Sequence, residues 1–165
     1  MFRIQGLASV LAAVCLTVFL SSCNSAPTVK SDFQAFQPTN PNNAVVYLYR
    51  PKSPWNIKSG EYPMALIDDK EVGTIKYEQH RVLELAPGRY NLRMTGANPE
   101  AKWTLRELEA NVSLKAGQTY YFRIAVSRNT DAENITSPTV YVVFMQPVSI
   151  KDGAHEVSTT RLADS

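Results

Sequence analysis

From Ala44 onward the chain alternates short runs of β-branched and aromatic residues with turn-forming residues, and this pattern constrains the fold more than any other feature. The first run, Val45 to Tyr49, ends at Arg50-Pro51. Short strands with turns about every eight to twelve residues are typical of an all-β sandwich or barrel. We expect eight strands, at residues 45–49, 65–67, 72–75, 81–85, 90–94, 108–114, 119–126 and 139–145.

Turn residues separate the expected strands. Asp68-Asp69-Lys70-Glu71 favours a hairpin, because Asp side chains bond to their own backbone. Ala86-Pro87-Gly88-Arg89 carries Pro and Gly where a type II turn requires them. Ala116-Gly117 turns the chain once more, and a positive φ at Gly117 would require glycine there.

One internal segment allows two interpretations. Residues 103–108 contain helix formers, and Leu105, Leu108 and Val112 fit a helical stripe. The apolar residues change from odd to even positions between Leu105 and Leu108, however, so a regular strand would point them to opposite faces. We therefore favour a strand with a bulge near Arg106.

The expected sandwich domain covers residues 44–150 and leaves a short C-terminal segment, residues 151–165. This segment forms either a tail or a short helix. Asp152 could cap the helix, whose apolar residues would be Ala154, Val157 and Leu162.

Residues 1–22 have the organisation of a signal peptide. Arg3 is the only charge before Cys23, and an almost unbroken apolar run of 14 residues extends from Leu7 to Leu20. A membrane span needs about 20 residues, so the run is short for one. The alternatives are an uncleaved anchor or an ordinary secretory signal.

The run ends in the tetrad Leu20-Ser21-Ser22-Cys23, which resembles the lipobox of bacterial lipoproteins. The resemblance implies cleavage before Cys23, acylation of its sulfur and new amino group by chains such as palmitate, and anchoring to the membrane. Two or more acyl chains give stable anchoring. Asn24 follows the cysteine, where Asp commonly retains such proteins at the inner membrane. We therefore expect an outer-membrane lipoprotein of the cell envelope, facing the periplasm or the cell surface.

The residues between Cys23 and the first strand are polar and contain several prolines, without any period. This composition predicts a flexible linker over residues 23–43, with a root-mean-square span of about 25 Å. Phe33 and Phe36 are unusual in a linker, and we expect them to pack against the domain.

Charge and cysteine content exclude some functions. Without Arg3, 16 Lys and Arg stand against 15 Asp and Glu, so no basic face is available for nucleic acid. Cys15 lies in the signal peptide and Cys23 is the expected acylation site. The domain therefore contains no disulfide and depends on core packing.

Four segments follow one another along the domain: Val46-Tyr47-Leu48-Tyr49-Arg50-Pro51, Leu66-Ile67-Asp68-Asp69-Lys70-Glu71-Val72-Gly73, Leu85-Ala86-Pro87-Gly88-Arg89-Tyr90 and Lys115-Ala116-Gly117-Gln118-Thr119-Tyr120-Tyr121-Phe122. Their order and spacing make residues 44–150 resemble the uncharacterised bacterial lipoprotein family catalogued as domain of unknown function 2846. The resemblance implies a small β-sandwich, which we expect to be Ig-like, on a lipid anchor. It brings no known activity and no established site residues.

No motif for catalysis or cofactor binding follows the signal peptide. His80 and His155 are the only histidines, whereas a zinc site takes three or four His, Cys or carboxylate ligands. Asp68 and Asp69 are interpreted as turn formers rather than as an acid–base pair. The sequence contains no Gly-x-Ser-x-Gly, P-loop or Gly-x-Gly-x-x-Gly motif. We therefore expect a protein that is not an enzyme and holds neither metal nor cofactor.

The most informative loop lies between Pro51 and Pro63, where Trp55 and Tyr62 stand in a polar stretch with Lys58 between them. Exposed aromatic residues beside hydrogen-bonding groups suit a protein hot spot or a sugar. Alternatively, Trp55 and Ile57 fold back and cover the open end of the sandwich. We expect an interaction or structural module whose partner is an unidentified envelope protein. The second hypothesis is a carbohydrate-binding module for peptidoglycan or surface glycan.

Overall fold

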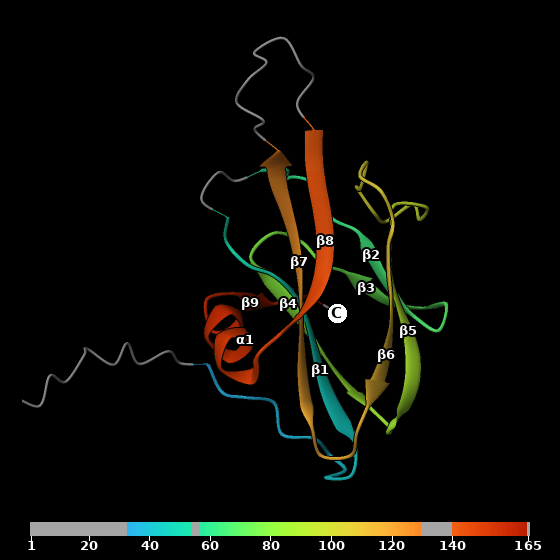
Figure 1. Cartoon of the computed structure of the whole chain (residues 1–165), viewed down its shortest axis with the longest axis vertical. Coiled ribbons are helices and arrows are strands. Elements are labelled where there is room, and N and C mark those ends of the chain that lie inside the picture. The colour runs from blue at the N-terminus through green and yellow to red at the C-terminus, as the bar shows by residue number, and fades with distance from the viewer. Residues whose placement is uncertain (1–32, 54–56, 130–139, 165) are drawn as a thin grey trace, which may run out of the picture. The chain divides into compact units, whose positions relative to one another are not determined.

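The computed structural model describes residues 33–53, 57–129 and 140–164. These residues form two β-sheets and one short helix, so the expected all-β sandwich is confirmed (Figure 1). The elements are β1 (Ala44–Arg50), β2 (Met64–Ile67), β3 (Lys70–Thr74), β4 (Gln79–Leu85), β5 (Gly88–Thr95), β6 (Leu108–Leu114), β7 (Thr119–Asn129), β8 (Val140–Val148), α1 (Ile150–Val157) and β9 (Arg161–Leu162).

One sheet has the strand order β8-β7-β1-β4-β9 and the other has the order β3-β2-β5-β6. The first strand lies at the centre of the five-stranded sheet, where β1 pairs antiparallel with β4 and parallel with β7. Strand β9 adds a second parallel pair at the edge of β4. Within the described residues, no helix is long and apolar enough to cross a membrane.

The main core lies between the two sheets. Alternate residues of β1, namely Ala44, Val46 and Leu48, point into it and are fully buried. They pack against residues of both sheets, including Leu92 of β5 and Ile124 of β7. Because the chain holds no cysteine after Cys23, this apolar contact stabilises the domain without a disulfide.

A second apolar cluster covers the outer face of the five-stranded sheet. Tyr47 stacks on Tyr121, with ring centroids 4.9 Å apart and planes within 6°. Val157 of α1 covers this pair, and Phe33 packs against the same cluster. Strand β1 is therefore buried on both faces, which explains why nearly all of its residues are apolar.

The expected C-terminal helix exists as α1, but Asp152 is not its N-cap. Ser149 caps the helix, and its Oγ accepts a hydrogen bond from the backbone N–H of Asp152 at 3.1 Å. The Ser149 hydroxyl in turn donates to Oδ2 of Asp152 at 2.7 Å. Asp152 thus lies in the first turn, where its carboxylate interacts favourably with the positive end of the helix dipole. Leu162 lies outside the helix, in β9, and is 59% exposed.

Two further expectations are wrong. Residues 103–107 form neither strand nor helix, because Lys102 is held in an isolated bridge to Tyr62 and β6 begins only at Leu108. Gly88 does not adopt the positive φ of a type II turn, because it already belongs to β5 and pairs with Leu114. The hydroxyl of Tyr90 donates instead to the carbonyl of Ala86 at 2.8 Å across this turn.

The other two expected turns are confirmed. Asp68 and Asp69 have φ values of 47° and 63°, which suits a two-residue hairpin loop between β2 and β3. Gly117 has a φ of 65°, in the left-handed region that favours glycine. The residue types were therefore sufficient to predict these two turns.

Residues 33–43, which we call the strap, were expected to belong to a flexible linker but lie against the domain. Phe33 meets the rings of Tyr47 and His80 edge-on, with centroids 6.1 and 6.2 Å away. The backbone N–H of Phe36 donates to the hydroxyl of Tyr47 at 2.8 Å. The expected packing of Phe33 is confirmed, whereas the Phe36 side chain stays exposed.

Candidate functional site

The loop between β1 and β2 carries the three residues proposed from sequence as a contact surface. Trp55 lies outside the described residues. Lys58 has a φ of 54°, and its ammonium lies 2.6 Å from Oε1 of Glu61 and 5.0 Å from the ring centroid of Tyr141. These contacts hold Lys58 beside the beginning of β8.

Tyr62 is half-buried and takes part in the structure of the loop. Its backbone exchanges two hydrogen bonds with Lys102, and Lys76 lies 5.6 Å from its ring centroid. Lys58 and Tyr62 therefore make separate internal contacts, and neither lines the cavity described next.

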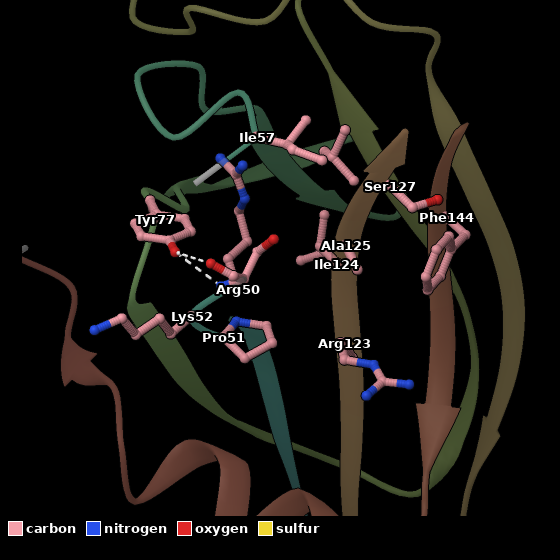
Figure 2. Close-up of a pocket in the computed structure, with 12 residues that line it drawn as sticks. Arg50, Pro51, Lys52, Ile57, Tyr77, Arg123, Ile124, Ala125, Ser127 and Phe144 are labelled. Carbon is pink, nitrogen blue, oxygen red and sulfur yellow. Dashed lines mark hydrogen bonds between the residues drawn. The ribbon is translucent and has the colours of Figure 1, made fainter. Parts of the chain in front are cut away.

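A cavity of about 270 Å³ opens beside the first part of this loop (Figure 2). Ala125 and Ser127 of β7 form part of its lining, and Phe144 of β8 pairs with Ala125 on the same sheet. Pro51 and Ile57 belong to the loop side. The full lining is Arg50, Pro51, Lys52, Ser53, Ile57, Tyr77, Arg123, Ile124, Ala125, Val126, Ser127 and Phe144.

Register places the cavity on the outer face of the five-stranded sheet. Arg123, Ala125 and Ser127 alternate along β7 with the buried core residues Phe122 and Ile124. Tyr121, two residues before Arg123, lies on the same outer face under α1. The helix therefore covers one part of this face, and the cavity occupies the next part along β7.

The loop side of the cavity is fixed by Tyr77. The Tyr77 hydroxyl accepts a hydrogen bond from the backbone N–H of Ser53 at 2.8 Å and donates to the Ser53 carbonyl at 3.1 Å (Figure 2). Tyr77 lies in the turn before β4, so these two hydrogen bonds tie the start of the loop to that turn. The start of the loop is thus preformed.

A buried cation lies under the same loop. Arg50 is only 3% exposed, and its guanidinium donates to the backbone carbonyls of Glu61 and Lys58. The guanidinium also lies 5.4 Å from the centroid of the Trp103 ring. Burial lowers the pKa of Arg50 to about 10, and the nearby Glu61 opposes that shift. Arg50 therefore stays charged at neutral pH and ties the loop to the end of the core.

Glu61 completes this arrangement. Its Oε2 accepts hydrogen bonds from the backbone N–H and the hydroxyl of Thr104, at 2.9 and 2.8 Å. Burial alone would raise the pKa of Glu61, but the hydrogen bonds from Lys58 and Thr104 outweigh it and lower the pKa. The carboxylate is a structural acceptor that connects the loop to residues 102–104.

On the other side of the cavity, Arg123 pairs with Glu156 of α1 at 2.8 Å. Glu156 also accepts a hydrogen bond from the hydroxyl of Tyr49 at 2.9 Å. Burial and this bond to a carboxylate raise the pKa of Tyr49 above its usual value. Tyr49 is accordingly a neutral donor, and the three side chains fasten α1 to the sheet beside the cavity.

The two histidines lie apart. His80 is buried on β4, with Nδ1 2.8 Å from Oγ1 of Thr160, and burial lowers its pKa. His155 is exposed on α1. Among the residues that the structure describes, no three His, Cys, Asp or Glu side chains cluster so that they could hold a metal ion.

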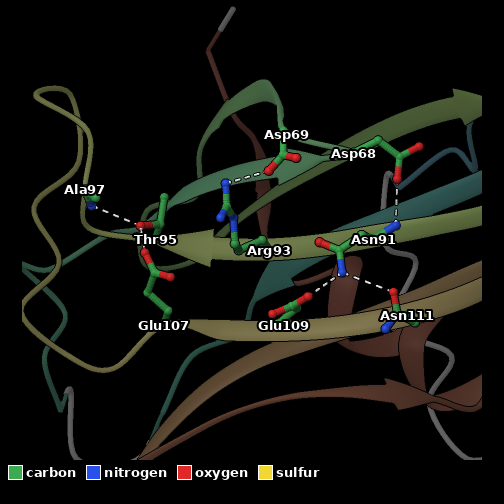
Figure 3. A network of polar contacts seen from close by, with 9 residues as sticks. All are labelled: Asp68, Asp69, Asn91, Arg93, Thr95, Ala97, Glu107, Glu109 and Asn111. Atoms are coloured by element: carbon green, nitrogen blue, oxygen red, sulfur yellow. Dashed lines mark hydrogen bonds and ion pairs between the residues drawn. The ribbon is translucent and has the colours of Figure 1, made fainter.

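The paired carboxylates at the β2–β3 turn are engaged in the four-stranded sheet (Figure 3). Oδ1 of Asp68 accepts from the backbone N–H of Asn91 at 2.8 Å, and Asp69 pairs with Arg93 at 2.7 Å. The Asn91 side chain donates further to Glu109 and Asn111 on β6. This network connects neighbouring strands, in agreement with the interpretation of both aspartates as turn residues.

The geometry defines a small two-sheet β-sandwich with a preformed cavity between a loop and the outer face of one sheet. The chain belongs to the family described as Protein of unknown function (DUF2846), whose model matches residues 40–139. The match covers β1 to β7 and both sides of the cavity, apart from Phe144. No curated protein and no solved structure matches the chain.

The sequence predicted the loop but not the residues from other elements that line the cavity with it. Tyr77, Ser127 and Phe144 carry no motif, and they are 50 and 17 residues apart along the chain. Tyr77 lies in the turn before β4, which pairs with β1, and Ser127 and Phe144 lie on the β7–β8 pair. The parallel pairing of β1 with β7 brings the two groups together, because it places the end of β1 beside the middle of β7. No local signal in the sequence indicates this pairing.

Proposed function

We propose that the protein is a non-catalytic, lipid-anchored interaction module of the outer membrane, and that its cavity receives an apolar side chain of a partner protein in the envelope. The observation that carries the proposal is the cavity of about 270 Å³ between Pro51–Ser53, Ile57 and the β7–β8 pair. Six of its twelve lining residues are apolar, and three of the others, Arg50, Lys52 and Arg123, are cationic.

The size of the cavity favours a side chain over a larger ligand. Pockets for drug-sized molecules range from about 300 to 1,000 Å³ and bury most of the ligand. A smaller, open cavity fits one apolar anchor residue, and such anchors dominate the binding energy of protein interfaces. Binding residues on a loop that a rigid sheet supports are also common in β-sandwich proteins.

The location of the proposed module rests on the sequence. The tetrad that ends at Cys23 supports acylation, and Asn24 supports the outer membrane. Anchoring by acyl chains would keep the domain at the membrane and concentrate it near partners there.

The proposal is tested by photo-crosslinking in intact cells. A photoreactive residue replaces Ser127 in the cavity wall or Ser113, an exposed residue of β6 in the other sheet. We expect discrete protein adducts from position 127 and none from position 113. Adding Phe144→Ala to the first variant should reduce the adducts at least tenfold, as for loss of an anchor contact of about 1.4 kcal/mol or more. Equal adducts at both positions would contradict the proposal.

The alternative ligand, peptidoglycan or surface glycan recognised through Trp55, Lys58 and Tyr62, is tested with the same protein. Sedimentation with purified peptidoglycan should leave the protein in the supernatant if the partner is a protein. Cosedimentation that Trp55→Ala abolishes, with unchanged melting temperature, would favour the glycan instead.

A further inference from the structure

The strap, residues 33–43, is fastened at its C-terminal half by three hydrogen bonds to the carboxylate of Glu84 and by one from the backbone N–H of Gly117 to the carbonyl of Asn43, at 3.2 Å. The backbone N–H groups of Thr39 and Asn40 donate to Oε2 and Oε1 of Glu84, at 2.7 and 2.8 Å. The side-chain amide of Asn43 donates to Oε1 of Glu84 at 2.8 Å. Charge-assisted bonds of this kind are stronger than those between neutral groups. Glu84 therefore acts as a clamp that receives three donors from the strap.

The N-terminal half of the strap is held by aromatic contacts. Phe33 lies edge-on to Tyr47 and His80, and the backbone N–H of Phe36 donates to the Tyr47 hydroxyl. Tyr47 also stacks on Tyr121, so its place in the domain does not depend on the strap. The two halves thus make independent contacts with the same sheet.

The strap has the properties of a segment that opens locally. It contains neither strand nor helix, and all of its residues except Phe33, Pro38 and Asn43 are exposed. Segments with few buried contacts open at a much lower free energy than the strands they lie on. Strand β1, which follows at Ala44, is fully buried and paired on both sides. Opening of the strap therefore stops at Ala44.

Opening would change how far the domain can stand from an anchor at Cys23. With the strap closed, 10 residues connect Cys23 to Phe33, and they can span no more than about 36 Å. With the strap open, 21 residues connect Cys23 to Ala44, and the limit becomes about 75 Å. The strap contacts therefore control about half of the available reach.

We propose that the strap is a releasable latch, clamped by Glu84, that sets the distance between the domain and the membrane. This inference rests on the proposed lipid anchor at Cys23. In the closed state the domain is held near the lipid surface, and in the open state its cavity reaches a partner further away. Within the described residues, Glu84 is the only carboxylate that accepts hydrogen bonds from the strap.

The first experiment measures the latch without reference to lipid. Amide hydrogen exchange is followed in the full chain in detergent micelles, with and without Glu84→Gln. The control is Glu109→Gln, which removes an exposed carboxylate on β6 that also accepts a hydrogen bond. We expect exchange at Thr39 and Asn40 to accelerate at least tenfold in Glu84→Gln only, with the amides of β1 unchanged. Unchanged exchange at Thr39 and Asn40, or equal acceleration in β1, would overturn the latch.

The second experiment measures reach on the membrane. The full chain is placed in nanodiscs with a fluorophore on Ser113→Cys, and energy transfer to an acceptor on the lipid headgroups is recorded. Glu84→Gln should lower the transfer efficiency, and Glu109→Gln should not. Equal transfer in all three proteins, despite faster exchange of the strap, would overturn the control of reach. A protein that does not associate with nanodiscs at all would refute the anchor at Cys23, while the exchange result still decides the latch.

Discussion

Replacing Gly153 by alanine should lift α1 from the five-stranded sheet. Gly153 is buried in the helix directly over Tyr121. An added Cβ would lie 2.5 Å from Cβ and 2.8 Å from Cδ1 of Tyr121, and nearer still to its Cγ. Carbon atoms in contact prefer about 3.5–4.0 Å, so the helix or the ring must move by about 1 Å. Tyr121 cannot turn away easily, because it stacks on Tyr47.

The sign of the effect follows from two opposing terms. Alanine in a helix interior is more favourable than glycine by about 1 kcal/mol. Overpacking costs about 1–3 kcal/mol, and a lifted helix also exposes part of Val157, whose full burial contributes about 1.5–3 kcal/mol. Val157 is completely buried in the native structure. We therefore expect a net loss of about 1–3 kcal/mol in the free energy of unfolding.

Urea denaturation of the chain from residue 24 onward measures this loss. Gly60→Ala is the matched control, because nothing lies within 4 Å of a Cβ at that position. It should be neutral or raise stability by less than about 1 kcal/mol. The clash also predicts that Tyr121→Val and Gly153→Ala together cost less than the sum of the two single changes. If Gly153→Ala is as stable as the wild type, the close packing of α1 on Tyr121 is refuted.

Four further predictions follow from the same structure and sequence. Burial lowers the pKa of His80, so the unfolded chain binds a proton more readily than the folded chain. The stability should be constant above about pH 7 and fall as the pH drops below 6.5, the ordinary pKa of histidine. His80→Gln should remove this dependence, as measured by melting at a series of pH values. Gly117→Val should cost about 1 kcal/mol or more in urea denaturation, because Gly117 has a positive φ; an unchanged midpoint would contradict this. Cys23→Ser should release or misprocess the protein, and mass spectrometry of the native N-terminal peptide should show an acylated Cys23. Trp55→Ala should lower stability by about 3–5 kcal/mol if the ring covers the core, and should weaken binding about thirtyfold with little change in melting temperature if it is a contact residue.

Local sequence patterns were sufficient for most elements of the fold. A run of β-branched and aromatic residues placed β1. The alternation of apolar and polar residues placed β5 and β6, because a strand with one buried face repeats every two residues. Turn chemistry at Asp68-Asp69 and Gly117 was equally local, since only residues that tolerate a positive φ fit there. Residues 103–107 misled the same reasoning. Their conformation is set by the bridge between Lys102 and Tyr62, 40 residues away.

In the candidate site, too, local sequence patterns predicted one part and long-range contacts decided the rest. The sequence by itself singled out the loop after Pro51, because aromatic residues in a polar loop are unusual. It also determined that the domain has no disulfide, and the residues up to Cys23 predicted its location in the cell. Only the tertiary structure brought Tyr77 to Ser53 and placed Phe144 across from the loop. It likewise showed that residues 33–43, polar enough for a linker, lie on the domain because Glu84 accepts their backbone donors. Periodicity records which face of a strand is buried, but not which distant strand or side chain covers it. Parallel pairing of β1 with β7 and capture of the strap by Glu84 are contacts between residues more than 40 positions apart, and the packing of the whole chain decides them.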